Sequence, residues 1–148
     1  MGELFMYKKI LLATDGSEYA NKAAEHAIWI ANNSNAELTI LHVLETSKLP
    51  KIENIRTENT IRDLLTQEAK TVFSKVSNIL KSCNCNVNVV YIRESGNPAD
   101  EIIKTVEKKV IDMVIMGTAG KHGLSRLWLG SVAENVVRYA PCPVLVVK

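Results

Sequence analysis

The feature that most constrains the fold is the alternation of short apolar runs with longer segments whose apolar residues recur every three or four positions. We expect strands at about 9–14, 37–44, 87–92, 112–116 and 142–148, and helices at about 18–31, 60–82, 98–109 and 131–139. Residues 45–58 show no clear periodicity and are expected to form a long surface loop. Apolar strands that alternate with helices favour an open parallel sheet covered by helices on both faces, a doubly wound α/β fold.

The composition excludes several classes of function. A length of 148 residues suits one domain, so 1–148 is treated as a single domain. The net charge of +2 comes from scattered basic residues without an aromatic platform, so we expect no nucleic-acid partner. No apolar run reaches the length of a membrane span, and the first residues lack a signal-peptide cleavage pattern. We therefore expect a cytoplasmic protein without a membrane partner.

The cysteines and histidines lack the context of a reactive site. Cys83, Cys85 and Cys142 have neither zinc nor redox spacing, so free thiols are expected. His26 and His42 belong to no motif and are interpreted as structural histidines. The chain also lacks the glycine spacing of a P-loop or of a dinucleotide fingerprint. No catalytic residue and no metal cage is assigned.

The segment between the fourth expected strand and the last helix has the pattern G-x2-G-x9-G-S, formed by Gly117, Gly120, Gly130 and Ser131. Glycine permits positive φ and close approach of a ligand to the backbone. Gly130 and Ser131 open a helix, where unpaired N–H groups and the helix dipole favour an anion. The intervening loop adds positive charge from Lys121, His122 and Arg126. These features predict a phosphate-binding loop.

A structural interpretation of the same residues stays open. Ser131-Val132-Ala133-Glu134 has the form of a capping box, in which Ser131 caps its own helix, and the glycines then only form turns. Asp15 is equally ambiguous. At the end of the first strand it can contact a ribose hydroxyl or help to hold a cation, but an Asp before Gly is also a common turn residue.

Five segments together resemble the universal stress protein family: KKILLATDGSE, LHV, GNPADEI, DMVIMGTAG and LGSVAENVVRYAPCPVLVV. G-x2-G-x9-G-[ST] is the motif of the ATP-binding branch of that family, and Gly117, Gly120, Gly130 and Ser131 fill it. The resemblance implies a Rossmann-like fold, related to adenine nucleotide alpha hydrolases, with strand order 3-2-1-4-5. It also implies ATP as ligand, with Mg²⁺ or Mn²⁺ carried on the phosphates.

The resemblance further implies which residues contact ATP. Thr14 and Asp15 would lie against the adenosine, and the backbone of Val43 would meet the base. The motif residues would hold the ribose and phosphates, and Met116 and Val132 flank them. The expected ATP site therefore comprises Ala13, Thr14, Asp15, Val43, Met116, Gly117, Thr118, Gly120, Lys121, His122, Gly130, Ser131 and Val132. Relatives commonly have His or Arg where this chain has Ala119, which removes one polar contact.

Three functions remain open. The first is an ATP-binding universal stress protein that acts as a nucleotide-dependent regulator or switch. The second is a slow metal-dependent ATPase or nucleotide-transferring enzyme, and the third is an interaction module without nucleotide.

A homodimer through the last strand is expected, both because the family is typically dimeric and because VLVV at 144–147 would leave an apolar sheet edge unpaired.

Overall fold

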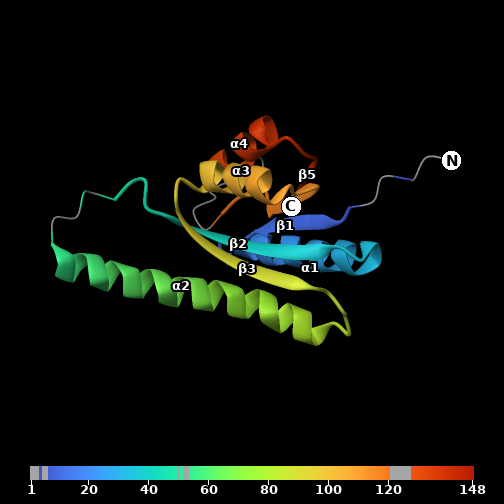
Figure 1. Cartoon of the computed structure of the whole chain (residues 1–148), viewed down its shortest axis with the longest axis horizontal. Coiled ribbons are helices and arrows are strands. Elements are labelled where there is room, and N and C mark those ends of the chain that lie inside the picture. The colour runs from blue at the N-terminus through green and yellow to red at the C-terminus, as the bar shows by residue number, and fades with distance from the viewer. Residues whose placement is uncertain (1–3, 5–6, 50, 52–53, 121–127) are drawn as a thin grey trace.

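The computed structural model describes residues 4, 7–49, 51, 54–120 and 128–148. Five strands and four helices alternate along this part of the chain (Figure 1). Their bounds are β1 (Lys9–Ala13), α1 (Glu18–Ser34), β2 (Glu37–Glu45), α2 (Ile55–Ser82), β3 (Val89–Gly96), α3 (Pro98–Lys109), β4 (Met113–Gly117), α4 (Ser131–Tyr139) and β5 (Val144–Val147).

The five strands form one sheet in the order β3-β2-β1-β4-β5, and every pair of neighbours is parallel. β1 lies at the centre, where Leu12 is in register with Ile40 of β2 and with Ile115 of β4. The predicted fold class and strand order are therefore confirmed. The chain runs from β1 outward to β2 and β3 and then crosses back to β4 on the other side of β1, so the strand order reverses between β1 and β4.

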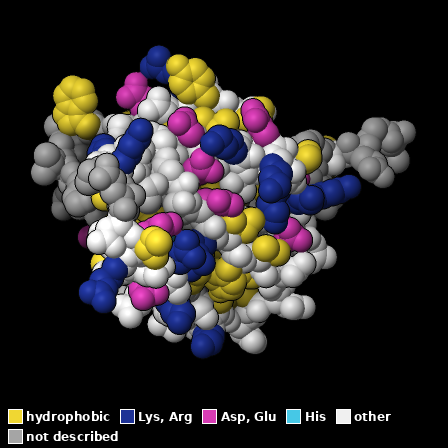
Figure 2. Space-filling view, turned by 60° about the vertical axis from the view of Figure 1, so that its left-hand side comes forward, with side chains coloured by type: hydrophobic (Ala, Val, Ile, Leu, Met, Phe, Trp, Pro, Cys, Tyr) yellow, Lys and Arg dark blue, Asp and Glu magenta, His cyan; other side chains and the backbone are white. Residues whose placement is uncertain are grey.

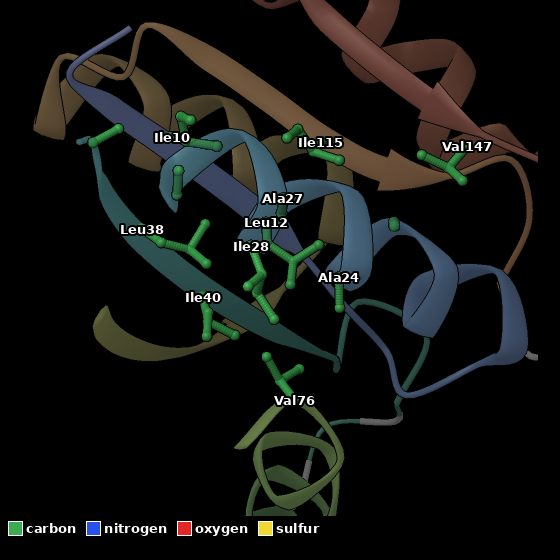
Figure 3. Packing of buried hydrophobic residues seen from close by; sticks show 13 residues of the cluster. Ile10, Leu12, Ala24, Ala27, Ile28, Leu38, Ile40, Val76, Ile115 and Val147 are labelled. Carbon is green, nitrogen blue, oxygen red and sulfur yellow. The ribbon is translucent and has the colours of Figure 1, made fainter. Parts of the chain in front are cut away.

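Helices cover both faces of the sheet. α1 and α2 lie on one face, and α3 and α4 lie on the other (Figure 1). Small residues of α1, among them Ala24 and Ala27, let this helix approach Leu12 and Leu38 closely (Figure 3). On the opposite face, Leu11 and Leu41 pack against Ile102 of α3 and Val136 of α4. Alternate residues of each strand thus enter different cores, as the two-residue period of a strand requires.

Local signals fix the starts of three helices. The Ser17 hydroxyl accepts a hydrogen bond from the Ala20 N–H at the start of α1. Asn97 caps α3, and Pro98 occupies its first turn. α2 begins at Ile55 rather than near residue 60, because the Asn54 side chain accepts a hydrogen bond from the Arg56 N–H at 2.9 Å. The loop predicted over 45–58 is therefore shorter than expected, and residues 50, 52 and 53 lie outside the described part of the chain.

Two further details differ from expectation or are unusual. Cys83 and Cys85 form a disulfide, so the expectation of three free thiols is wrong for this pair, while Cys142 is free. α3 ends at Val110 in the left-handed conformation, with φ 54° and ψ 57°. None of the described helices has the length and apolar composition needed to cross a membrane.

Candidate functional site

A pocket of about 490 Å³ lies at the carboxyl ends of the strands, between the ends of β1 and β4. This is the place where the strand order reverses and where open α/β sheets bind their ligands. All the predicted site residues that the structure describes line it: Ala13, Thr14, Asp15, Val43, Met116, Gly117, Thr118, Gly120, Gly130, Ser131 and Val132. Lys121 and His122 lie outside the described residues.

The β1–α1 turn orients the carboxylate of Asp15. Its Oδ1 accepts a hydrogen bond from the Ser17 N–H at 2.9 Å, and the Thr14 hydroxyl accepts one from the Gly16 N–H at 3.2 Å. Gly16 adopts φ 77°, which permits the sharp turn before α1. Asp15 is thus the turn residue that one interpretation predicted, and it lines the pocket as the other interpretation required.

Gly120 leaves the space that the Asp15 carboxylate occupies. A Cβ on Gly120 would be 2.5 Å from Asp15 Oδ2, and no real Cβ contact is that short. A Cβ on Gly117 would be 2.8 Å from the backbone of Tyr19, so this glycine allows β4 to end against α1. Neither glycine has positive φ, since among the described glycines only Gly16 and Gly96 do. The positive φ that these glycines permit is therefore not used, and it is other parts of the chain that approach them closely.

The N-terminus of α4 forms one wall of the pocket through Gly130, Ser131 and Val132. Gly130 is the N-cap residue, and no side chain caps the helix. The predicted capping box is therefore wrong: Ser131 is the first helical residue and does not cap α4. Its hydroxyl is placed beside the first N–H groups of the helix, where an anion is stabilised by the dipole.

The pocket also contains residues that sequence reasoning missed: Leu41, His42, Glu45, Lys48, Glu68, Pro98 and Ile102. His42 directly precedes the predicted Val43, so its neighbourhood was available from the sequence. Glu68 lies in the middle of α2 and carries no local signal, because only the packing of α2 on the sheet brings it to the pocket. His42 is 1% exposed, which agrees with the interpretation as a structural histidine.

Charges around the pocket do not form a purely basic surface. The described lining holds the carboxylates of Asp15, Glu45 and Glu68, and its lysine, Lys48, pairs with Glu45 at 3.0 Å. Basic and acidic side chains are also mixed over the face seen in Figure 2. The described residues contain no group of three or more side chains suited to hold a metal ion. A polyanionic ligand here would bring its own cation or rely on the α4 N-terminus.

The fold and the pocket define a doubly wound α/β protein with a pocket at the switch point of its sheet. The chain belongs to the universal stress protein family, whose model matches residues 6–148. Universal stress protein MJ0531 of Methanocaldococcus jannaschii is 40% identical over 143 residues, which are 97% of this chain and 83% of that protein. Universal stress protein MJ0577 of the same organism is 34% identical over 159 residues, with 97% and 96% covered.

Solved structures give the same result for the fold. The structure of MJ0577 has a TM-score of 0.84 at 38% identity and covers 97% of both chains. UspA of Lactobacillus plantarum has a TM-score of 0.83 at 26% identity, with 98% of this chain and 100% of that chain covered. A universal stress protein in complex with cAMP has a TM-score of 0.71 at 23% identity, with 97% and 99% covered, and here the likeness concerns the fold alone.

Proposed function

We propose that this chain is an ATP-binding universal stress protein that acts as a nucleotide-dependent regulator in the cytoplasm. The observation that carries the proposal is the convergence of three segments on one pocket: the end of β1 with Asp15, the end of β4 with Gly120, and the start of α4 with Ser131. These segments are far apart in the sequence, and all three belong to the motifs that resemble the ATP-binding branch.

The pocket offers a different environment to each part of ATP. Leu41, Val43 and Ile102 form an apolar wall at the end of β2 and suit the adenine ring. Asp15 suits a ribose hydroxyl, because a carboxylate accepts hydrogen bonds. Ser131 and the first N–H groups of α4 suit the phosphates. A pocket of about 490 Å³ matches the range typical of sites for molecules of this size.

The charge of the pocket supports a metal-bound nucleotide. Three carboxylates in the described lining oppose a bare triphosphate, so we expect ATP to bind with Mg²⁺ or Mn²⁺ on its phosphates. The ion neutralises part of the phosphate charge, and Ser131 with the α4 N-terminus holds the remainder. No described residue is assigned a catalytic role, so binding rather than turnover is the proposed activity.

The test is calorimetric titration of ATP into protein freed of bound nucleotide, with Mg²⁺ and with a chelator. We expect saturable binding of one ATP per chain that weakens without Mg²⁺. Ser131→Ala removes a charge-assisted hydrogen bond worth about 1.5–3 kcal/mol, so the Kd should rise by about tenfold or more. Because Ser131 does not cap α4, the fold should tolerate this change.

The matched control is Ser77→Ala on α2, which removes a hydroxyl outside the pocket and should leave the Kd unchanged. Failure of the wild-type protein to bind ATP in the presence of Mg²⁺ would overturn the proposal. An identical Kd for the two serine variants would remove Ser131 from the site. Chromatography of the incubated nucleotide decides the enzymatic alternative, since steady release of phosphate or AMP would contradict a role limited to binding.

A further inference from the structure

The two backbone carbonyl groups that flank Asp15 are each held by a side chain from another part of the chain. His42 Nδ1 lies 2.9 Å from the carbonyl oxygen of Thr14. Lys75 Nζ donates to the carbonyl oxygen of Gly16 at 2.8 Å. Helix N-terminal turns usually satisfy such groups locally or with water. Here the Thr14–Asp15 peptide group is fixed from β2, and the Gly16–Ser17 peptide group is fixed from α2.

The hydrogen bond to the Thr14 carbonyl determines that Nδ1 of His42 is a donor. A carbonyl oxygen can only accept, so Nδ1 must carry the hydrogen. Nε2 of the same ring lies 3.3 Å from Glu68 Oε1 and has no hydrogen-bond partner among the described residues. His42 is 1% exposed, so this contact lies in the interior of the protein.

α2 takes part in both carbonyl contacts: it provides Lys75 directly, and its Glu68 contacts His42. Glu68 and Lys75 are seven positions apart and therefore lie on the same face of the helix. Between and beside them, Val72 and Val76 are buried against the sheet and anchor that face. Val72 also packs next to Gly16, 3.2 Å from the place of a Cβ on that glycine. The position of α2 therefore sets the position of the turn that contains Asp15.

We propose that His42 and Lys75 are positioning residues for nucleotide selection, through which α2 fixes the Asp15 carboxylate toward the ribose. Glu68 orients His42, and the two carbonyl contacts restrain the Thr14–Asp15 peptide group and the Gly16–Ser17 peptide group, whose N–H binds Asp15. The inference rests on the proposed function for its ligand, but the arrangement of the turn can be measured without nucleotide.

The first test compares the affinity for ATP with that for 2′,3′-dideoxyATP, which lacks the ribose hydroxyls. His42→Leu and Lys75→Met remove the donors at similar volume, and the Kd ratio of the two nucleotides should fall about five- to tenfold, as expected for one hydrogen bond. His42→Asn places an amide N–H near Nδ1, and Lys75→Arg keeps a donor, so both should retain the ratio. Equal weakening of both nucleotides by all four variants would show a merely structural role and overturn the inference.

The second test needs no ligand. Amide NMR of the free protein should show faster hydrogen exchange and a shifted signal for the Ser17 N–H, the donor to Asp15, in His42→Leu, Lys75→Met and Glu68→Ala. Glu68→Gln should restore the wild-type signal, because its amide can donate to Nε2. Glu58→Ala is the matched control, since Glu58 pairs with Arg62 on the outer surface of the same helix.

These outcomes separate the two proposals. If the wild-type protein does not bind ATP but the Ser17 amide responds as expected, the proposed function fails and the role of α2 stands. If ATP binds but the Ser17 amide is the same in all variants, the positioning role fails and the proposed function stands.

Discussion

At the scale of single residues, the pocket depends on a contact between Asp15 and Gly120. The two residues follow neighbouring strands, and the missing side chain of Gly120 provides the space for Asp15 Oδ2. The Ser17 N–H holds the other oxygen of the same carboxylate. Gly120 and Asp15 therefore act as one unit, and a change in either residue alters the environment of the other.

Gly120→Ala should displace the Asp15 carboxylate, because the new Cβ would lie 2.5 Å from Oδ2. We expect the Kd for ATP to rise about tenfold, and the free energy of unfolding to fall by about 1 kcal/mol from overpacking. Calorimetric titration and urea unfolding measure the two effects. In an Asp15→Ala background, where the space is open, the second change should have little further effect. Fully additive effects of the two changes would contradict this explanation.

The need for these glycines could be predicted from the sequence, but the reason for it could not. The residues of the pattern G-x2-G-x9-G-S line the pocket, and the pattern is visible in the sequence because it combines short-range spacing with a strand before it and a helix after it. The steric partners of Gly117 and Gly120 are Tyr19 and Asp15, about a hundred positions away, and no local pattern reveals them. The capping box proposed for Ser131 was wrong for a local reason: Glu134 follows Ser131 at the right spacing, but the N-cap is Gly130 and Ser131 is already the first helical residue.

At the scale of helices and strands, the predicted order was confirmed because each element has its own period and its own boundary residues. Asn97-Pro98 marks the start of α3, and the alanines of α1 mark its buried face. The start of α2 was the main error. Its first turns are largely exposed and lack an apolar stripe, so only the Asn54 cap indicates that the helix extends to Ile55.

The end of α3 offers a stability prediction. Val110 is β-branched and 72% exposed, and it adopts φ 54°, where its side chain is strained and little apolar surface is buried. Val110→Gly should therefore raise the free energy of unfolding by about 0.5–1 kcal/mol, after allowing for the greater freedom of the unfolded chain. Urea denaturation of both proteins measures this change in the free energy of unfolding.

Val137→Gly provides the contrast, because Val137 is also exposed but lies inside α4 with helical dihedral angles. This change should lower the free energy of unfolding by about 0.5–1 kcal/mol, since glycine disfavours a helix interior. A loss of stability in Val110→Gly equal to that in Val137→Gly would show that the left-handed conformation at Val110 carries no strain.

At the scale of the whole molecule, the sheet has two edges, β3 and β5. The Pro143 carbonyl accepts a hydrogen bond from Val114 of β4, and the Val147 carbonyl accepts one from Thr118, which directly follows β4. The backbone groups of the alternate residues Val144 and Val146 therefore point to the open edge. Exposed apolar side chains of α4, Val137 and Tyr139, belong to the same part of the molecule. An apolar edge of this kind favours pairing with a second copy.

We therefore expect a homodimer by light scattering at micromolar protein concentration. Val146→Pro removes an N–H that points away from β4, so it should dissociate the dimer while the circular dichroism spectrum stays unchanged. Val146→Thr keeps the N–H and a β-branched side chain and should remain dimeric. A monomeric wild-type protein, or a Val146→Pro variant that stays dimeric, would exclude pairing through β5.

The central position of β1 has a consequence for how the chain is made. β1 is among the first segments to be synthesised, yet its neighbour β4 follows much later: Lys9 and Asp112, which hydrogen-bond where the two strands begin, are 103 positions apart. During translation β1 can pair with β2 but must wait for β4, so one edge of a buried apolar strand stays open. Contacts of such long sequence separation also slow folding. The nascent chain is therefore most exposed to aggregation, and most dependent on chaperones, just before the segments that complete the pocket leave the ribosome.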